Sequence, residues 1–238
     1  MTENKAIEDH EQQLAARLVV YADITRCFYY PDEELLAFLD SGELEEHLPV
    51  YRLLGTEPSE HFERIKQWRQ EHNTQENALL ELRREYTGLF ITARPKVPAP
   101  PYGSLYLESD GMIWGDSTRE AVKLYMEAGL KISDGFKDIP DHFAAEAEFI
   151  WYLTWEELKA RGISEKEGKG VPDMERASKI SSIREKFLLN HLTKWAPLFL
   201  YKVISSGSKS IFYREFSQVT KAFLHSEAER LVCKSSLT

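Results

Sequence analysis

The stretch IPDHFAAEAEFIWYLTWEELKARG, residues 139–162, predicts a long helix in the middle of the chain. Pro140 fits its first turn, because the N–H that a proline lacks has no partner there inside a helix. Gly162 ends it, because glycine readily adopts the left-handed conformation that follows many helices. The helix is therefore expected over about residues 140–161, and the segments on either side decide whether the whole fold is helical.

Helical signals continue in both directions from this stretch. Apolar residues at steps of three and four mark one face of a first helix, at Leu14, Leu18, Tyr21, Thr25 and Phe28. Capping residues, glycines and prolines bound the others. The other helices are expected from Asp32 to Gly42, from Ser59 onward, from Thr74 onward, from Asp116 or Ser117 to Gly129, from about 175 to Trp195, and from about 209 to 232. A break or kink is expected near Pro197.

Strand signals are few, and SLYLES, residues 104–109, is the one segment with convincing alternation of polar and apolar residues. The sequence therefore predicts an all-α protein, a single-domain helical bundle of roughly nine to eleven helices over residues 1–238. The charged, glycine-rich segment ISEKEGKGVPD is typical of a loop. This loop, near 162–173, is the place where the bundle could divide into two lobes.

Composition favours a globular protein of the cytoplasm. Hydrophobic residues make up 42% of the 238 residues, enough for a core, and no run approaches the roughly 18 apolar residues that span a bilayer. The N-terminal sequence MTENKAIEDHE lacks the basic and apolar regions of a signal peptide. Cys27 and Cys233 lie far apart and imply neither a disulfide framework nor a zinc ribbon.

The net charge of −9 is unevenly distributed along the chain. Residues 1–76 hold 17 acidic and 7 basic residues, a net charge of −10, whereas residues 163–238 hold 8 and 13, a net charge of +5. The acidic N-terminal third argues against nucleic acid as a partner, because such affinity depends on Lys and Arg neutralising phosphates. It suits a basic partner, whose encounter rate charge complementarity would raise.

PAPPYGSLYLES, residues 98–109, interrupts the helical pattern with a stiff segment. The four prolines from Pro95 to Pro101 exclude a helix there. We call residues 98–106 the proline strap. Its tyrosines and its Gly-Ser pair have no catalytic partner within the segment, so the strap is better suited to shaping a binding surface than to chemistry.

Two patterns suggest chemistry, and both are incomplete. GISEKEGKG resembles a phosphate-binding loop, but five residues rather than four separate Gly162 from Gly168, and Lys169 is followed by Gly170 instead of Ser or Thr. His142 and Glu146 share a helix face with Asp141 nearby, but no further ligand pair completes a metal site. Asp141 is also a candidate helix cap. We therefore expect no cofactor, no metal and no turnover.

Three segments together resemble the TorD/DmsD/NarJ family of redox-enzyme maturation chaperones, most closely its TorD-like branch. They are EYTGLFITARPKVPAPPYGSLYLE, residues 85–108; IPDHFAAEAEFIWYL, residues 139–153; and FLLNHLTKWAPLFLYKV, residues 187–203, followed by IFYREFSQVTKAFL. The order and separation of the three segments also agree with the family, and the resemblance covers nearly the whole chain.

The resemblance implies an all-helical chaperone that is not an enzyme. Such chaperones bind the twin-arginine leader peptide, and sometimes the body, of the apo-form of a molybdopterin oxidoreductase catalytic subunit. They hold it for cofactor insertion and folding before export. Nucleic acid and stable membrane insertion are not implied, and both a monomer and a homodimer remain open.

The resemblance also places the family's peptide-binding Asp-His pair on Asp141 and His142. A leader has a basic region and an apolar region, so its site needs acidic groups beside an apolar groove. The residues expected to supply this groove are Tyr102, Ser104, Tyr106, Asp141, His142, Phe143 and Glu146. We expect the proline strap to pack beside the start of the 140–161 helix, with Asp141 and His142 exposed in the groove. Alternatively, Tyr102 and Tyr106 are core residues that pin a crossover loop.

Two other function classes remain open from the sequence. A small-ligand or nucleotide-binding helical protein or enzyme would use Asp141, His142 and Glu146, but it needs a phosphate cradle or a complete ligand set. A ligand-sensing regulatory domain would need a helix-turn-helix with a basic face, whereas the N-terminal region is acidic.

Overall fold

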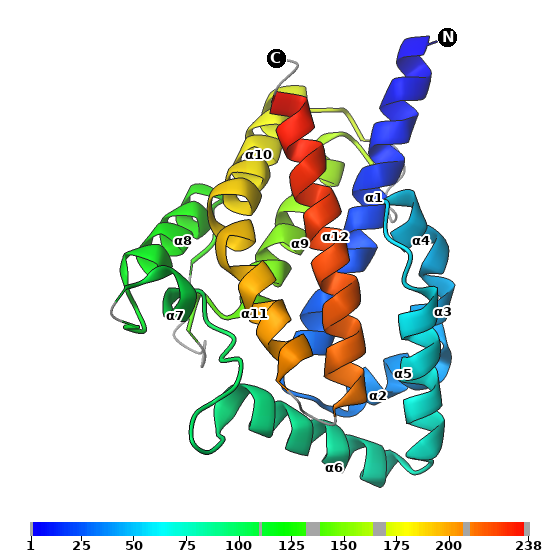
Figure 1. The fold of residues 1–238 in the computed structure, drawn as a ribbon. Helices are drawn as coiled ribbons and strands as arrows, with labels where there is room; N and C mark the ends of the chain where they lie inside the picture. The colour runs from blue at the N-terminus through cyan, green and yellow to red at the C-terminus, as the bar shows by residue number, and fades with distance from the viewer. Residues whose placement is uncertain (1, 110, 132–138, 164–169, 207–209, 236–238) are drawn as a thin grey trace.

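The computed structural model describes residues 2–109, 111–131, 139–163, 170–206 and 210–235, and these residues are predominantly helical (Figure 1). Ten of the twelve α-helices in the described part of the chain have six or more residues, which agrees with the predicted all-α fold. The elements are α1 (Thr2–Phe28), α2 (Glu33–Ser41), α3 (Glu43–Glu46), α4 (Leu48–Leu53), α5 (Ser59–Glu71), α6 (Gln75–Tyr86), the π-helix η1 (Thr87–Ile91), α7 (Ser104–Leu107), α8 (Asp116–Glu127), α9 (Phe143–Ala160), α10 (Met174–Phe187), the π-helix η2 (Leu188–Leu192), α11 (Thr193–Ser205) and α12 (Ile211–Ser235).

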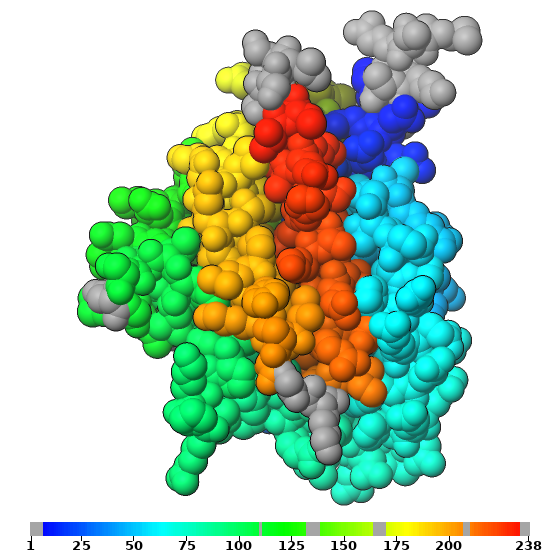
Figure 2. All heavy atoms as spheres, viewed as in Figure 1, coloured from blue at the N-terminus to red at the C-terminus, as the bar shows by residue number. Residues whose placement is uncertain are grey.

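The long helices α1, α9, α10, α11 and α12 form the centre of the bundle. α9 packs most extensively against α1 and α10, and α12 packs against α11 and α5. In Figure 1, α7 and α8 lie on the α10 side and α6 crosses below the lower ends of α11 and α12. Figure 2 shows α10, α11 and α12 as a continuous surface across one face.

Aromatic side chains fill the centre of this bundle. The ring of Phe28 lies 4.9 to 6.4 Å, between centroids, from four other aromatic rings, and all five side chains are at most 3% exposed. The four are Phe90, Phe143, Phe199 and Phe216. Because they come from five different elements, one aromatic cluster joins segments that are far apart in the sequence.

Several helix ends follow the predicted capping residues. The Asp32 side chain accepts a hydrogen bond from the N–H of Leu35 at 3.0 Å, and Thr74 accepts one from Asn77 at 3.2 Å. Gly42 and Gly129 follow α2 and α8 with φ angles of 79° and 83°, in the left-handed region that glycine adopts without strain.

Some local predictions are wrong. SLYLES contains the helical turn α7 instead of a strand, because alternation over a few residues cannot make a strand without a partner strand. Asp116 and Ser117 do not cap α8. The Glu108 carboxylate accepts the Ser117 N–H at 2.7 Å instead, so a residue outside the helix supplies the cap. Pro197 does not break its helix, and the alternative, a kink near it, stays a prediction. The widened π-turn η2 precedes it, and α11 continues through the proline.

Residues 164–169, within the loop predicted to separate two lobes, lie outside the described ranges. The residues that flank this segment are joined by backbone hydrogen bonds. The N–H of Gly170 donates to the carbonyl of Gly162 at 2.9 Å, and the N–H of Asp173 donates to the carbonyl of Ala160 at 2.7 Å. The number of lobes therefore stays a prediction.

Among the described helices, none combines the length and hydropathy that crossing a bilayer requires.

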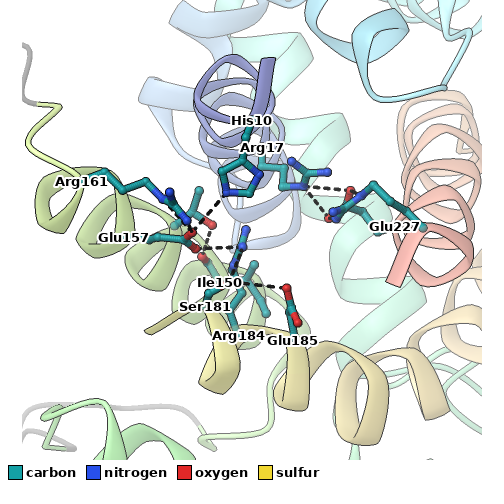
Figure 3. Close-up of polar contacts among 11 residues, drawn as sticks. His10, Arg17, Ile150, Glu157, Arg161, Ser181, Arg184, Glu185 and Glu227 are labelled. Carbon is teal, nitrogen blue, oxygen red and sulfur yellow. Dashed lines mark hydrogen bonds and ion pairs between the residues drawn. The ribbon is translucent and has the colours of Figure 1, made fainter. Parts of the chain in front are cut away.

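Buried ion pairs fasten the first helix to the bundle (Figure 3). Arg17 of α1 is 1% exposed, and its Nε donates to both carboxylate oxygens of Glu227 on α12 at 3.0 and 2.9 Å. Arg230, one turn further along α12, donates to the same carboxylate at 2.8 Å. α1 and α12 are thus joined by a fully desolvated pair.

A second buried carboxylate, Glu157 of α9, lies between Arg161 and Arg184 at 2.9 Å from each (Figure 3). Burial raises the pKa of Glu157, but the contacts with His10, Arg184 and Arg161 outweigh it and lower that pKa to about 2. Because the carboxylate stays ionised, α9 and α10 are held together by charge as well as by apolar contact.

We predict that Arg17→Ala lowers the free energy of unfolding by about 3 kcal/mol, because removing one partner of a buried ion pair leaves the other charge poorly compensated. Chemical denaturation followed by circular dichroism measures this. Arg17→Met combined with Glu227→Leu should cost less, since neither charge is then buried alone. The matched control is Arg119→Ala, whose pair with Asp116 is exposed and should contribute at most about 1 kcal/mol. An Arg17→Ala loss as small as that of the control would contradict the prediction.

Candidate peptide-binding site

The proline strap packs against the residues that precede α9, as the sequence predicts. Gly103 donates its N–H to the carbonyl of Asp141 at 2.9 Å, and Phe143 donates to that of Pro101 at 2.8 Å. Tyr102 and His142 form an isolated antiparallel bridge between the two segments. The strap is therefore held by backbone hydrogen bonds to the beginning of α9.

Asp141 connects three segments through its side chain. Its Oδ2 accepts the backbone N–H of Ser104 at 2.7 Å and the hydroxyl of Thr118 at 3.0 Å. These donors belong to the beginning of α7 and to α8. Because Asp141 is fully buried, the hydrogen bonds offset the cost of removing its carboxylate from water.

Glu146, one turn into α9, connects the same helix to the C-terminal half of the chain. Its Oε1 lies 2.6 Å from Nε2 of His191, and its Oε2 accepts the indole N–H of Trp195 at 3.0 Å. Burial raises the pKa of Glu146. Burial also disfavours the charged form of His191, but the adjacent Glu146 carboxylate outweighs it and raises the pKa of His191. The pair links two of the segments on which the family resemblance rests.

His142, rather than Asp141, caps α9. Its Nδ1 accepts the N–H of Ala144 at 3.1 Å, and its Nε2 lies 3.3 Å from the hydroxyl of Tyr86. The imidazole is parallel to the ring of Tyr29, with centroids 5.9 Å apart and an interplanar angle of 2°. Tyr102 meets it edge-on at 5.4 Å. The ring is thus held from several sides.

The expectation that Asp141 and His142 are exposed is wrong. Asp141 is 0% exposed and His142 1%, and the predicted partners Ser104, Phe143 and Glu146 are buried to the same degree. The physical reason is that internal N–H and O–H groups pair with Oδ2 of Asp141, with the imidazole of His142 and with both carboxylate oxygens of Glu146, so the fold can bury these side chains. The structure therefore brings the predicted residues together beneath the surface, and whether the region binds a peptide stays a prediction.

The two tyrosines of the strap are partly buried. The ring of Tyr106 packs against Trp195, with centroids 5.5 Å apart, and the ammonium group of Lys202 lies 4.3 Å above it. Burial raises the pKa of the Tyr106 phenol and so favours its neutral form. For Tyr106, these contacts favour the alternative in which it pins a crossover loop.

An open groove of about 320 Å³ begins at Tyr29, the residue that stacks on His142. Its walls combine aromatic rings with three carboxylates and one guanidinium. They are Ala22, Thr25, Arg26, Tyr29, Tyr30, Asp32, Glu34, Glu148 and Trp151. The hydroxyl of Tyr29 donates to the carboxylate of Glu148 at 2.7 Å. We call this surface the acidic groove.

Arg26 offsets only part of the negative charge of the acidic groove, because it is one cation beside three carboxylates. Its guanidinium carbon lies 4.3 Å from the centroid of the Phe38 ring, and one of its nitrogens is 3.7 Å from Glu43, which is not a groove residue. The groove therefore keeps a surplus of negative charge. The sequence did not predict the acidic groove, although the acidic N-terminal third and the Tyr29-Tyr30 pair indicated the charge and the aromatic rings that line it.

A second hollow, of about 250 Å³, lies beside η1. It is lined by Glu81, Arg84, Glu85, Gly88, Leu89, Pro98 and Ser210. Burial raises the pKa of Glu85 to about 7, although the hydroxyl of Ser210 donates to its carboxylate at 2.7 Å. In the described part of the chain, no group of three or more His, Cys, Asp or Glu side chains could hold a metal ion.

Residues 55–200, more than half of the chain, match the family described as nitrate reductase delta subunit. The chain belongs to this family. It is 27% identical to the chaperone protein TorD of Salmonella arizonae over 86% of each chain. It is 28% identical to the chaperone protein TorD of Escherichia coli O139:H28 over 91% of this chain and 95% of that one.

A solved structure agrees with the fold of this family member. The crystal structure of a redox enzyme maturation protein from Archaeoglobus fulgidus matches 90% of this chain and 93% of that one, with a TM-score of 0.52 and 23% identity. The family resemblance predicted from the three sequence segments is confirmed. Because the relatives are named as chaperones, the prediction of a redox-enzyme maturation chaperone rather than an enzyme is also confirmed.

We predict that Asp141→Ala lowers the free energy of unfolding by about 1–3 kcal/mol, because it leaves the buried N–H of Ser104 without its acceptor. A thermal melt and chemical denaturation measure the loss. The control is Asp116→Ala, an exposed carboxylate that should change stability by within about 0.5 kcal/mol. An Asp141→Ala variant as stable as the control would show that the buried hydrogen bonds contribute nothing.

Glu85 should make stability depend on pH. Its folded pKa of about 7 exceeds the ordinary value of 4.5, so the folded state binds the proton more tightly and its stability falls as pH rises from about 4.5 to 7. Glu85→Gln keeps an acceptor for Ser210 and removes the titration. We therefore expect the variant to be more stable than the wild type at pH 8, with a flatter profile. Equal profiles from urea denaturation at several pH values would contradict this.

Proposed function

We propose that this chaperone binds the twin-arginine leader of a redox-enzyme subunit in the cytoplasm and holds the subunit for cofactor insertion before export. The client class is the apo-form of a molybdopterin oxidoreductase catalytic subunit. Family membership supports the maturation role. The observation that carries the leader assignment is the acidic groove, which joins three carboxylates to aromatic rings on an open surface.

The groove suits an arginine side chain. A guanidinium pairs with carboxylates through charge-assisted hydrogen bonds, and it is attracted to the faces of aromatic rings. Glu148 is exposed and its carboxylate is oriented by the hydroxyl of Tyr29, so one acceptor is already positioned. Trp151 lines the same groove and can offer ring surface to the cation. Tyr30 is 50% exposed, and the guanidinium carbon of Arg83 already lies 5.9 Å from its ring centroid.

The buried residues of the predicted site would act as support. His142 stacks on Tyr29, and Asp141 holds the strap beside it. Tyr102 contacts His142 edge-on. In this proposal Ser104, Tyr106, Phe143 and Glu146 contribute in the same indirect way, by fixing the start of α9 from which Glu148 projects. A leader would therefore touch the groove and not the Asp141 carboxylate.

We expect Glu148→Gln to weaken binding of a synthetic leader peptide, with two adjacent arginines and a following leucine-alanine segment, by about tenfold or more. A hydrogen bond to a charged group contributes about 1.5–3 kcal/mol, and the variant removes the charge. Titration calorimetry measures the affinity, and a thermal melt checks that the variant is folded.

The matched control is Glu60→Gln, a carboxylate that is 85% exposed on α5, away from the groove. It should bind the peptide like the wild type. A peptide with both arginines replaced by glutamine should lose most of its affinity. The proposal fails if the wild type does not bind the leader, or if a folded Glu148→Gln variant binds it unchanged.

A further inference from the structure

We infer that the apolar segment of the leader lies along a row of aromatic side chains on α9, with its arginines in the acidic groove and its apolar end directed toward Lys159. The row consists of Trp151, Tyr152 and Trp155. This inference rests on the proposed function and adds to it a second subsite and a direction for the bound peptide.

The row follows one face of a helix. Glu148, Trp151, Tyr152, Trp155 and Lys159 are separated by steps of three, one, three and four residues, which place their side chains on one side of α9. At a rise of 1.5 Å per residue, the face from Glu148 to Lys159 is roughly 16 Å long. That length can accept several residues of an apolar segment.

The row is presented to solvent although most of α9 is buried. Trp155 is 39% exposed, and Trp151 and Tyr152 are partly buried. The two indoles are nearly parallel, with centroids 6.1 Å apart and an interplanar angle of 7°, and Tyr152 lies 6.4 Å from Trp155. Adjacent aromatic rings that reach the surface from a helix otherwise packed into the core mark a surface for an apolar partner.

The row is continuous with the acidic groove. Trp151 lines the groove and also stacks on Trp155, so a chain leaving the groove along α9 meets the row directly. Leader peptides carry arginines followed by apolar residues. One peptide can therefore satisfy both surfaces, whereas a purely apolar or purely basic partner would leave one of them unused.

Charge sets the direction of the bound chain. The groove end carries three carboxylates, those of Asp32, Glu34 and Glu148, against the single guanidinium of Arg26. At the other end, the ammonium group of Lys159 lies 3.9 Å from the centroid of the Trp155 ring, and it pairs with Glu156 at 2.8 Å. A leader bound in the opposite direction would place its arginines beside this lysine. Like-charge repulsion there disfavours that orientation.

Double-mutant cycles with the full chain and the same synthetic leader test the inference. We expect Trp155→Ala to weaken binding about tenfold, and to weaken it little further when the distal leucines of the peptide are replaced by alanine. Likewise, Glu148→Gln should weaken binding little further once the arginines of the peptide are replaced. It should keep its full effect when only the distal leucines are replaced. Titration calorimetry supplies the affinities, and thermal melts confirm that the variants are folded.

The matched control is Tyr201→Ala. Tyr201 is an exposed aromatic residue on α11 with an ammonium group 5.4 Å from its ring centroid, and it lies outside the proposed surface. It should leave leader affinity unchanged. If the leader binds but Trp155→Ala has no effect, or couples to the arginines, this inference is wrong while the proposed function stands. If Trp155→Ala instead abolishes self-association seen by sedimentation without changing leader affinity, the row is an interface between copies and the inference is also wrong.

Discussion

Two carboxylates are buried at the beginning of α9, and the cost of removing them from water constrains much of the structure. An ionised carboxylate is expensive to bury unless donors surround it. Asp141 finds its donors in Ser104 and Thr118, and Glu146 finds them in His191 and Trp195. The strap, α8, η2 and α11 must therefore meet α9 at fixed positions. This explains why the three segments of the family resemblance, which are far apart in the sequence, meet in the fold.

This constraint separates the supporting residues from the accessible ones. The buried cluster ends at His142, whose ring is stacked on Tyr29. Tyr29 in turn donates to Glu148 on the surface. Two consecutive contacts thus connect a fully buried hydrogen-bond network to an open groove. A change at Asp141 can alter the groove without any contact between that carboxylate and a ligand.

Much of the fold follows from local sequence signals, because caps and breakers act within a few residues. Asp32, Thr74, Gly42 and Gly129 bound helices as predicted. Placement of the strap beside α9 was also predictable, from the family resemblance. Burial was not, because helical spacing shows which residues share a face and does not show what covers that face. Asp141 looked like an exposed binding group since its donors lie 23 and 37 residues away.

The acidic groove was hidden from sequence reasoning for a related reason. Its tyrosines directly follow α1, whereas Glu148 belongs to α9, 119 residues after Tyr29. Only the packing of those two helices brings them together. The same packing explains why the site can be rigid. α9 is anchored at its beginning by Asp141 and Glu146 and near its end by the pairs around Glu157, so the exposed side chains between these anchors stand on a fixed helix. A surface that is already ordered loses little conformational entropy when a flexible peptide binds, and the peptide alone then bears most of that cost.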